Sequence, residues 1–384
     1  MAISFDKPSP LQRIAPIFQG FDGVLFVAIL LLAGIGLVTM YSVGFDHGTR
    51  FTDHSRNMLL AAGVMFLVAQ VPPQRLMTLA LPGYLLGVVL LLGVEFLGIE
   101  RKGSQRWLDV GMVIQPSELM KIAMPMMLAW WFQRREGQLG TLDFGMALLL
   151  LAVPAALILK QPDLGTTLLV VASGLFVIFF AGLSWKIIVP PVLLGAIGIV
   201  TLIAMEPSWC APDVDWRILH EYQRQRVCTL LDPFKDPLGR GFHIIQGMIA
   251  IGSGGVWGKG FMQGTQTHLE FIPERTTDFI FAAFSEEFGL LGVIGLLLAL
   301  LFLVMRGLMI ALNAPTLFTR LLAGALTLNI FVYAFVNMGM VSGILPVVGV
   351  PLPFISYGGT AMVTLGLAVG MLMSIAKAKR LVQA

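Results

Sequence analysis

The chain has 384 residues, of which 57% are hydrophobic and only 12% are charged, with a formal net charge of +3. Soluble domains average about 25% charged residues, so this composition indicates a polytopic membrane protein. The small net charge, without a basic stripe interleaved with aromatic residues, argues against a nucleic-acid partner. The first apolar run, 21–43, exceeds the roughly 7–15 residues of a signal-peptide core and no small-residue cleavage site follows it. We therefore expect it to be retained as a membrane anchor.

Ten apolar runs approach or reach the roughly 20 residues that a helix needs to cross a bilayer. They are 21–43, 56–71, 76–98, 114–132, 144–160, 164–182, 185–205, 277–305, 318–342 and 355–376. Lys and Arg in the short loops mark the cytoplasmic side, and their distribution places both termini there. The predicted fold is an all-α polytopic membrane protein with about ten transmembrane helices, forming a single domain over 1–384. Its large extracytoplasmic loop, 206–276, joins the seventh and eighth helices.

Both cysteines of the chain, Cys210 and Cys228, fall in the loop 206–276. A disulfide can persist outside the cytoplasm, so their pairing is a hypothesis, and two unpaired thiols are the alternative. Two cysteines alone do not make a zinc site. The stretch YQRQRVCTLL in the same loop predicts an amphipathic helix at the membrane surface.

Three cations, Arg101, Lys102 and Arg106, lie in the outer loop 99–113, against the trend that places positive charge inside. An anionic ligand would account for them, and so would lipid headgroups. Glu118 and Lys121 follow at a spacing of i, i+3, so they share a face of a helix that should begin near residue 116. The spacing alone does not decide whether this pair is structural or part of a site.

Other polar residues also interrupt the apolar pattern. Asp163 in QPDLGT comes directly before an apolar run, where an Asp usually caps a helix. Asn329, Tyr333 and Asn337 recur at i, i+4, i+8 and should face the bundle interior, either to bond other helices or to contact a substrate. The glycine cluster GSGGVWGKGF, 252–261, fails the phosphate-loop template because glycine follows its lysine, so we expect tight turns there.

The segment VSGILPVVGVPLPFISYGGT, 341–360, contains three prolines and cannot be a regular helix throughout. Non-helical backbone at membrane depth is tolerated where protein buries it or where it lines a polar cavity, to which Ser356 and Thr360 could present hydroxyls. Asp278 lies where PERTTDFIF turns from polar to apolar, and a charge at the edge of a span is a functional candidate. Together these features predict an outward-opening polar cavity, basic enough for a phosphorylated lipid, with a candidate general base.

Five long blocks of the sequence resemble the SEDS family, in particular its elongation-type members. They are RWLDVGMVIQPSELMK, QPDLGTTL, the stretch from YQRQRVCTLL to GKGF, LEFIPERTTDFIFAAFSEEFG, and NMGMVSGILPVVGVPLPFISYGGT. The resemblance implies a ten-span inner-membrane peptidoglycan glycosyltransferase with its active site facing the periplasm. It implies that Asp278 is the essential acidic residue. The Cys210 and Cys228 pair, with the nearby WCAPDVDW, departs from the family pattern.

The reaction implied by this resemblance needs one base and a group of cations. Asp278 would take the proton from the acceptor 4-hydroxyl, and direct attack would invert the anomeric carbon. The candidate substrate-binding residues are Arg101, Lys102, Arg106, Glu118, Lys121, Asn337 and Ser356. A divalent cation could help to hold the pyrophosphates, although no dedicated ligand set is evident, and no nucleotide or organic cofactor is expected. The implied partners are a class B penicillin-binding protein, lipid II, polyprenyl pyrophosphate and other membrane proteins of the elongation complex.

Two other classes of function would use the same features. A flippase for lipid-linked precursors would need a polar path to the cytoplasmic side, whereas the carboxylates and cations here gather on the outer side. A non-catalytic scaffold that activates a penicillin-binding protein would not depend on the Asp278 carboxylate. The roles of Glu286 and Glu287, about 12 Å beyond Asp278 in a regular helix, are left open.

Overall fold

The computed structural model describes residues 21–46, 48–101, 104–109, 111, 113–205, 210, 221–239, 241–272 and 274–382. Its ten long helices follow the ten predicted runs in order and confirm the all-α polytopic fold class. They are α2 (Gly23–Val43), α3 (Arg50–Ala69), α5 (Ala80–Leu97), α6 (Pro116–Arg134), α7 (Thr141–Lys160), α8 (Leu164–Phe180), α9 (Trp185–Ala204), α14 (Ile280–Leu312), α15 (Leu317–Val341) and α16 (Gly359–Val382). A short helix, α4 (Pro73–Thr78), lies in the hairpin before α5.

Much of the surface of this bundle is apolar and suited to contact with lipid. Among the described residues, six helices are long and apolar enough to cross a membrane by themselves, namely α2, α5, α7, α14, α15 and α16. Large apolar side chains are exposed on the outer faces of α2, α5, α7 and α14, as Val27, Leu30 and Leu31 are on α2. Such faces are stable in hydrocarbon and costly in water. The chain is therefore a multi-pass membrane protein.

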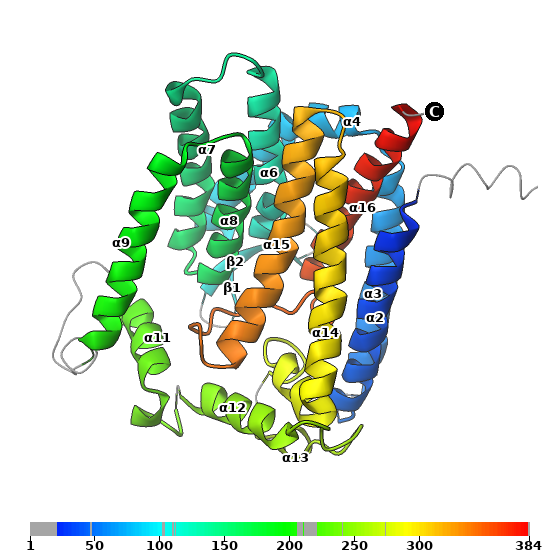
Figure 1. Cartoon of the computed structure of the whole chain (residues 1–384). Helices are drawn as coiled ribbons and strands as arrows, with labels where there is room; N and C mark the ends of the chain where they lie inside the picture. The colour runs from blue at the N-terminus through cyan, green and yellow to red at the C-terminus, as the bar shows by residue number, and fades with distance from the viewer. Residues whose placement is uncertain are drawn as a thin grey trace, which may run out of the picture.

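Helix α15 occupies the centre of the bundle and packs against α14, α8, α6 and α16 (Figure 1). Asn329, Tyr333 and Asn337 on this helix are all buried, which confirms that the polar stripe faces the interior. Around this centre, α3 packs along α16, and α2 packs along α14. The segment 342–358 between α15 and α16 is not helical, as its prolines predict.

The long loop between α9 and α14 contains helices of its own at one end of the bundle (Figure 1). They are α11 (Glu221–Leu231), the 3-10 turn η1 (Pro233–Lys235), α12 (Phe242–Gly254) and α13 (Thr265–His268). Helix α11 confirms the helix expected from YQRQRVCTLL. The helices α12 and α13 were not predicted.

The cation-bearing loop between α5 and α6 forms a small antiparallel sheet that the sequence analysis did not predict. Its strands are β1 (Ile99–Arg101), β2 (Ser104–Asp109) and β3 (Val113–Ile114), in the order β1-β2-β3. Arg101 pairs with Ser104, and Leu108 pairs with Ile114. Since β2 packs on α5 and α6, the sheet holds Arg106 beside the helical bundle.

Candidate active site

Asp278 lies in the turns before α14, two residues before that helix begins at Ile280. Its side chain is half-buried. The Thr277 and Phe279 amides donate to the Glu274 carbonyl at 3.0 and 3.2 Å, and Thr277 Oγ1 donates to Glu274 Oε2 at 2.8 Å. Asp278 is therefore part of a hydrogen-bonded turn at the edge of the apolar helix.

Arg275 anchors this turn to the end of α2. Its Nε donates to the Val43 carbonyl at 3.2 Å, and its guanidinium forms an ion pair with Asp46. The same side chain is buried and lies 5.5 Å from the centre of the Phe45 ring. No local sequence pattern indicates this anchor, because Val43 and Asp46 lie more than 200 residues away in the chain.

Asn337 ties the Asp278 turn to the non-helical segment 342–358. Its Nδ2 donates to the Asp278 carbonyl at 2.9 Å and to the Val350 carbonyl at 2.7 Å. The side chain is completely buried. One amide group thus holds two backbone segments in place around the carboxylate.

Ser356 makes a second connection between the same two segments. Its Oγ donates to the Thr277 carbonyl and accepts from the Leu352 amide, both at 2.7 Å. The Tyr357 amide donates to the Thr276 carbonyl at 2.8 Å. The Ser356 hydroxyl is thus engaged with backbone, and contact of Ser356 or Asn337 with a substrate stays a prediction.

Gly349 brings the segment 342–358 close to the Asp278 carboxylate. Its φ of +71° lies in the left-handed region that favours glycine. A Cβ added at Gly349 would lie 3.5 Å from Asp278 Oδ2. The adjacent Val348 lies against the start of α8, where a Cβ at Gly165 would come within 2.6 Å of the Val348 carbonyl oxygen. The segment is therefore enclosed between Asp278 and α8.

Asp163 and Arg106 lie at this start of α8. Asp163 caps the helix by accepting from the Thr166 amide at 3.1 Å, which confirms the predicted cap. Its carboxylate also accepts from Gln115 Nε2 at 3.0 Å and lies 3.5 Å from Arg106 Nη1. Arg106 comes from β2 and is partly exposed, so it can present charge to an outer ligand.

Glu118 and Lys121 form the predicted pair on α6. Lys121 Nζ lies 2.6 Å from Glu118 Oε1, and both side chains are almost entirely buried. Thr364 on α16 donates to the second Glu118 oxygen at 3.1 Å. Lys121 Nζ lies 5.0 Å from the centre of the Tyr333 ring. Because Tyr333 is one turn from Asn337 on α15, this ion pair and the Asp278 turn are attached to the same helix face.

The other two cations predicted to bind substrate, Arg101 and Lys102, have side chains outside the described residues. Arg101 ends β1, whereas the whole of Lys102 lies outside them. Their contact with a substrate stays a prediction.

Glu286 binds the outer loop to α14. Its carboxylate accepts from Lys259 Nζ at 2.6 Å and from the Gln266 and Thr267 amides at 2.9 and 3.2 Å. The Glu286 side chain is completely buried, so these contacts replace the water that it loses. Sequence spacing gave no such assignment, since it does not show which backbone amides approach a carboxylate.

Glu287 connects α14 to α2 by accepting from Ser42 Oγ at 2.5 Å. Just beyond it, α14 is interrupted at Gly289, whose φ is +64°. There the glycine cluster pairs with α14 through backbone bonds such as Leu290 to Gly255, at 2.9 Å. The cluster has positive φ at Gly255, Gly258 and Gly260, which confirms the expected tight turns.

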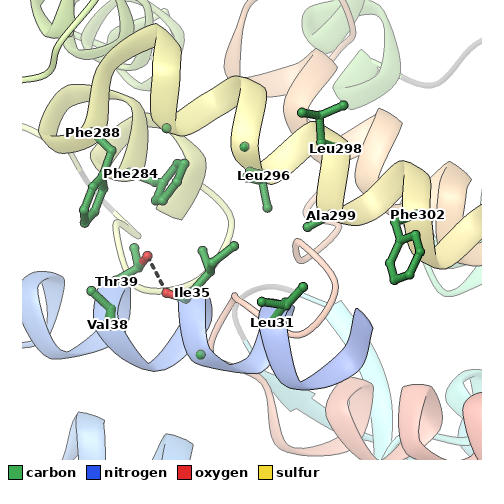
Figure 2. Close-up of a pocket in the computed structure, with 13 residues that line it drawn as sticks. Leu31, Ile35, Val38, Thr39, Phe284, Phe288, Leu296, Leu298, Ala299 and Phe302 are labelled. Carbon is green, nitrogen blue, oxygen red and sulfur yellow. Dashed lines mark hydrogen bonds between the residues drawn. The ribbon is translucent and has the colours of Figure 1, made fainter. Parts of the chain in front are cut away.

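An apolar groove of about 570 Å³ lies between α2 and α14 (Figure 2). Aromatic rings of Phe284, Phe288 and Phe302 and aliphatic side chains of Leu31 and Ile35 line it. Gly34, Gly292 and Gly295, which have no side chain to fill the space, also line the groove. A groove of this chemistry suits a hydrocarbon chain.

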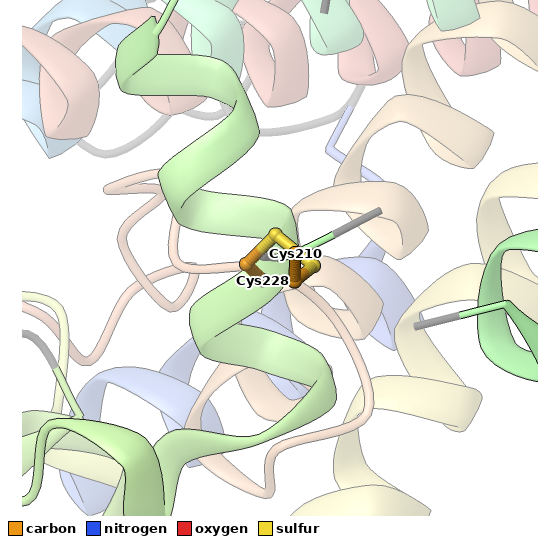
Figure 3. Close-up of a disulfide and its surroundings, with 2 residues drawn as sticks. All are labelled: Cys210 and Cys228. Carbon is orange, nitrogen blue, oxygen red and sulfur yellow. A yellow bond between two sulfur atoms is a disulfide. The ribbon is translucent and has the colours of Figure 1, made fainter. Parts of the chain in front are cut away.

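A disulfide joins Cys210 to Cys228 on α11, with a Cα–Cα distance of 5.7 Å (Figure 3). This confirms the pairing hypothesis for the two cysteines. Arg226, half a turn earlier on α11, donates from Nη1 to the Val347 carbonyl at 3.0 Å. Helix α11 is thus attached both to the chain beyond α9 and to the segment that borders Asp278.

Comparison with known proteins places these features in a family. The family model described as cell cycle protein, FtsW/RodA/SpoVE, matches residues 23–381. The curated peptidoglycan glycosyltransferase MrdB of Escherichia coli K12 is 48% identical over 353 residues, which cover 92% of each chain.

Two solved structures are also similar. A chain from a structure on the coordination of polymerization and crosslinking by a peptidoglycan synthase complex is 31% identical, with a TM-score of 0.76 and coverage of 94% of this chain and 98% of that one. The rod shape determining protein RodA of Thermus thermophilus is 25% identical, with a TM-score of 0.69 over 94% and 97% of the two chains. The match over nearly the whole length confirms the predicted resemblance, and the chain belongs to the FtsW/RodA/SpoVE family.

Proposed function

We propose that this chain is a peptidoglycan glycosyltransferase that polymerises lipid II into glycan strands during cell-wall elongation and the maintenance of cell shape. The observation that carries the proposal is the half-buried side chain of Asp278. Asn337 and Ser356 donate hydrogen bonds to the Asp278 and Thr277 carbonyls and so fix the backbone of its turn. The 48% identity with a curated peptidoglycan glycosyltransferase, over nearly the full length of both chains, supports the reaction type.

In the proposed reaction, the acceptor 4-hydroxyl oxygen attacks the anomeric carbon of the donor sugar. Its proton passes to an Asp278 carboxylate oxygen as the new glycosidic bond forms. The bond from the anomeric carbon to the pyrophosphate oxygen breaks on the opposite face, and polyprenyl pyrophosphate leaves with the electron pair. One direct displacement inverts the anomeric configuration. A single positioned base suffices, because pyrophosphate is a good leaving group once its charge is neutralised.

Arg106 is the described cation best placed to receive the pyrophosphate. It is partly exposed on β2, and its partner Asp163 lies at the start of α8, which touches the segment next to Asp278. A guanidinium can make paired hydrogen bonds to phosphate oxygens. Arg101 and Lys102, which precede Arg106 closely in the sequence, would add charge. Lys121 is buried against Glu118, so it would act on the ligand only if the site opens toward α6.

The lipid tails require apolar grooves beside the site. The groove between α2 and α14 offers about 570 Å³ of such space along the helix that follows Asp278. Each CH₂ group buried there contributes about 0.8 kcal/mol of transfer free energy. The groove therefore supports a prenyl-linked substrate.

A divalent cation stays a candidate for sharing the pyrophosphate charge. Within the described residues, no three His, Cys, Asp or Glu side chains gather into a metal-binding group. Such a cation would be held by Asp278 together with the phosphate oxygens and would neutralise part of the pyrophosphate charge.

We further propose that the protein works in the bacterial inner membrane with both termini in the cytoplasm and the Asp278 side facing the periplasm. The positive charge of the short loops supports this orientation. The likeness to a chain of a peptidoglycan synthase complex supports a class B penicillin-binding protein as the partner for crosslinking.

Polymerisation of lipid II by the purified protein with its partner, whose transpeptidase is blocked, tests this function. We expect glycan strands whose new linkages are inverted relative to lipid II, as NMR of the product would show. A protein that makes no strands but carries labelled lipid II across vesicle membranes would be a flippase instead. Retention of the donor configuration would contradict the direct displacement.

A further inference from the structure

A cavity of about 630 Å³ with a mixed polar and apolar lining lies between α11 and α12 at one end of the bundle. Its volume falls within the roughly 300–1,000 Å³ of small-molecule sites. The described residues that line it include Gln225, Arg226, Thr229, Asp236, His243 and Val347. None of the side chains proposed above for the reaction belongs to this lining.

The cavity adjoins the Asp278 turn from two directions. The His243 ring on α12 lies 5.6 Å, between ring centres, from Phe279, the residue that follows Asp278. On the other side, Val347 lies two residues before Gly349, where an added Cβ would lie 3.5 Å from Asp278 Oδ2. The cavity therefore lies directly beside the Asp278 turn.

The lining offers donors and acceptors of hydrogen bonds without a dominant charge. Gln225 and Thr229 contribute an amide and a hydroxyl, while the opposite charges of Arg226 and Asp236 offset each other. Such a mixture suits sugar hydroxyl and acetamido groups, which donate and accept at once. It does not suit a pyrophosphate, which needs several cations, whereas apolar side chains such as Val347 can pack against the faces of sugar rings.

His243 contributes to the cavity a ring nitrogen whose hydrogen bonding is unsatisfied. Its Nδ1 is buried and has no hydrogen-bond partner among the described parts of the protein. Buried polar atoms are nearly always paired, so this nitrogen calls for a ligand or a water molecule. Burial lowers the pKa of His243, and the nearby Glu274 carboxylate opposes that shift only partly. The ring therefore stays neutral near pH 7, with one nitrogen to donate and one to accept.

We propose that this α11–α12 cavity is a subsite for the growing glycan, binding N-acetylated amino sugars one or two units away from the bond being formed. The inference rests on the proposed function. A subsite there would hold the strand between additions, so that many sugars are added before the strand leaves. The disulfide from Cys228 to Cys210 attaches the α11 wall of the cavity to the chain beyond α9.

Two variants test the subsite in the full-length protein with its partner. His243→Ala removes the imidazole, and Thr229→Val removes only a hydroxyl at nearly constant volume. Gln246→Ala, three residues after His243 on α12 and outside the lining, is the matched control. We expect products several-fold shorter from the two cavity variants, with the rate of the first coupling of two lipid II molecules unchanged. The control should give wild-type lengths.

Chitotetraose, a soluble N-acetylglucosamine oligomer, is the binding probe and requires no turnover. Losing one hydrogen bond weakens binding by roughly threefold to tenfold, so each cavity variant should bind chitotetraose that much more weakly in saturation-transfer NMR. Wild-type affinity and product length in both variants would overturn the proposal. So would normal chitotetraose binding with lost association with the partner, because the cavity would then be a protein-docking surface. If the wild-type protein makes no glycan, the proposed function fails, while chitotetraose binding still decides the subsite.

Discussion

Removing the amide of Asn337 should slow catalysis far more than it disturbs folding. Asn337 Nδ2 donates to the Asp278 and Val350 carbonyls at 2.9 and 2.7 Å, and no solvent reaches it. Each such bond contributes about 0.5–1.5 kcal/mol, so the two together contribute about 1–3 kcal/mol to holding the base in place. At about 1.36 kcal/mol for each tenfold change in rate, Asn337→Ala should lower kcat by roughly 5- to 150-fold.

Asn337→Asp is the sharper variant, because it keeps the size of the side chain. At neutral pH a carboxylate oxygen would then face two carbonyl oxygens in place of the donating nitrogen, so we expect a larger loss than with Ala. The assay is lipid II polymerisation at saturating substrate, with Tm measured on the same samples. Asn329→Ala is the matched control, since Asn329 is buried on the same face of α15, two turns away from the Asp278 contact. An Asn337→Asp protein within twofold of the wild-type rate, or an equal loss in Asn329→Ala, would refute this reasoning.

Three further changes have expected outcomes. Glu118→Gln leaves the Lys121 charge buried without its carboxylate, at a cost of about 3–5 kcal/mol, so Tm in detergent should fall sharply. Adding Lys121→Met should restore most of that Tm, and an unchanged Tm in the single variant would show that the pair is not buried as described. Gly349→Ala places a side chain at φ +71° beside Asp278, which costs about 1–2 kcal/mol and should reduce the polymerisation rate about 5- to 30-fold. If Gly349→Val is as active as the wild type, this segment does not position the site. Cys228→Ser frees α11 from the chain beyond α9, so limited proteolysis should cut the outer loop faster, as it should in wild type treated with reductant. Equal cutting rates in all three samples would mean that the disulfide does not restrain α11.

Most of the fold could be predicted from hydrophobicity because a bilayer-spanning helix needs a long apolar run. The helix boundaries were less accurate where polar residues continue a helix beyond the hydrocarbon. The apolar run predicts a helix from residue 56, whereas α3 begins at Arg50. The first turns of α3 are rich in polar residues, so hydrophobicity does not reveal them. The sheet at 99–114 was missed because its strands are only two to six residues long.

The candidate site divides in the same way. The Glu118–Lys121 pair and the Asp163 cap follow from local spacing, so the sequence predicted both. The partners of Glu286, by contrast, are the Lys259 side chain and two backbone amides about 20 residues or more away, and Arg275 bonds to Val43 and Asp46 at and just beyond the end of α2. No periodicity encodes such contacts. They depend on where turns bring distant backbone together, which the tertiary structure alone decides.

The most direct test of the central claim compares the single-turnover rate of lipid II coupling in Asp278→Asn with that in the wild type. Loss of a positioned general base typically costs about 10²- to 10⁴-fold, and the near-isosteric amide leaves the turn and its backbone bonds intact. Asp109→Asn, which changes an exposed carboxylate on β2, is the matched control and should keep the wild-type rate. We predict a loss of at least roughly 10²-fold in Asp278→Asn, with unchanged Tm and unchanged association with the partner. A rate within about tenfold of the wild type would contradict the assignment of Asp278 as the base.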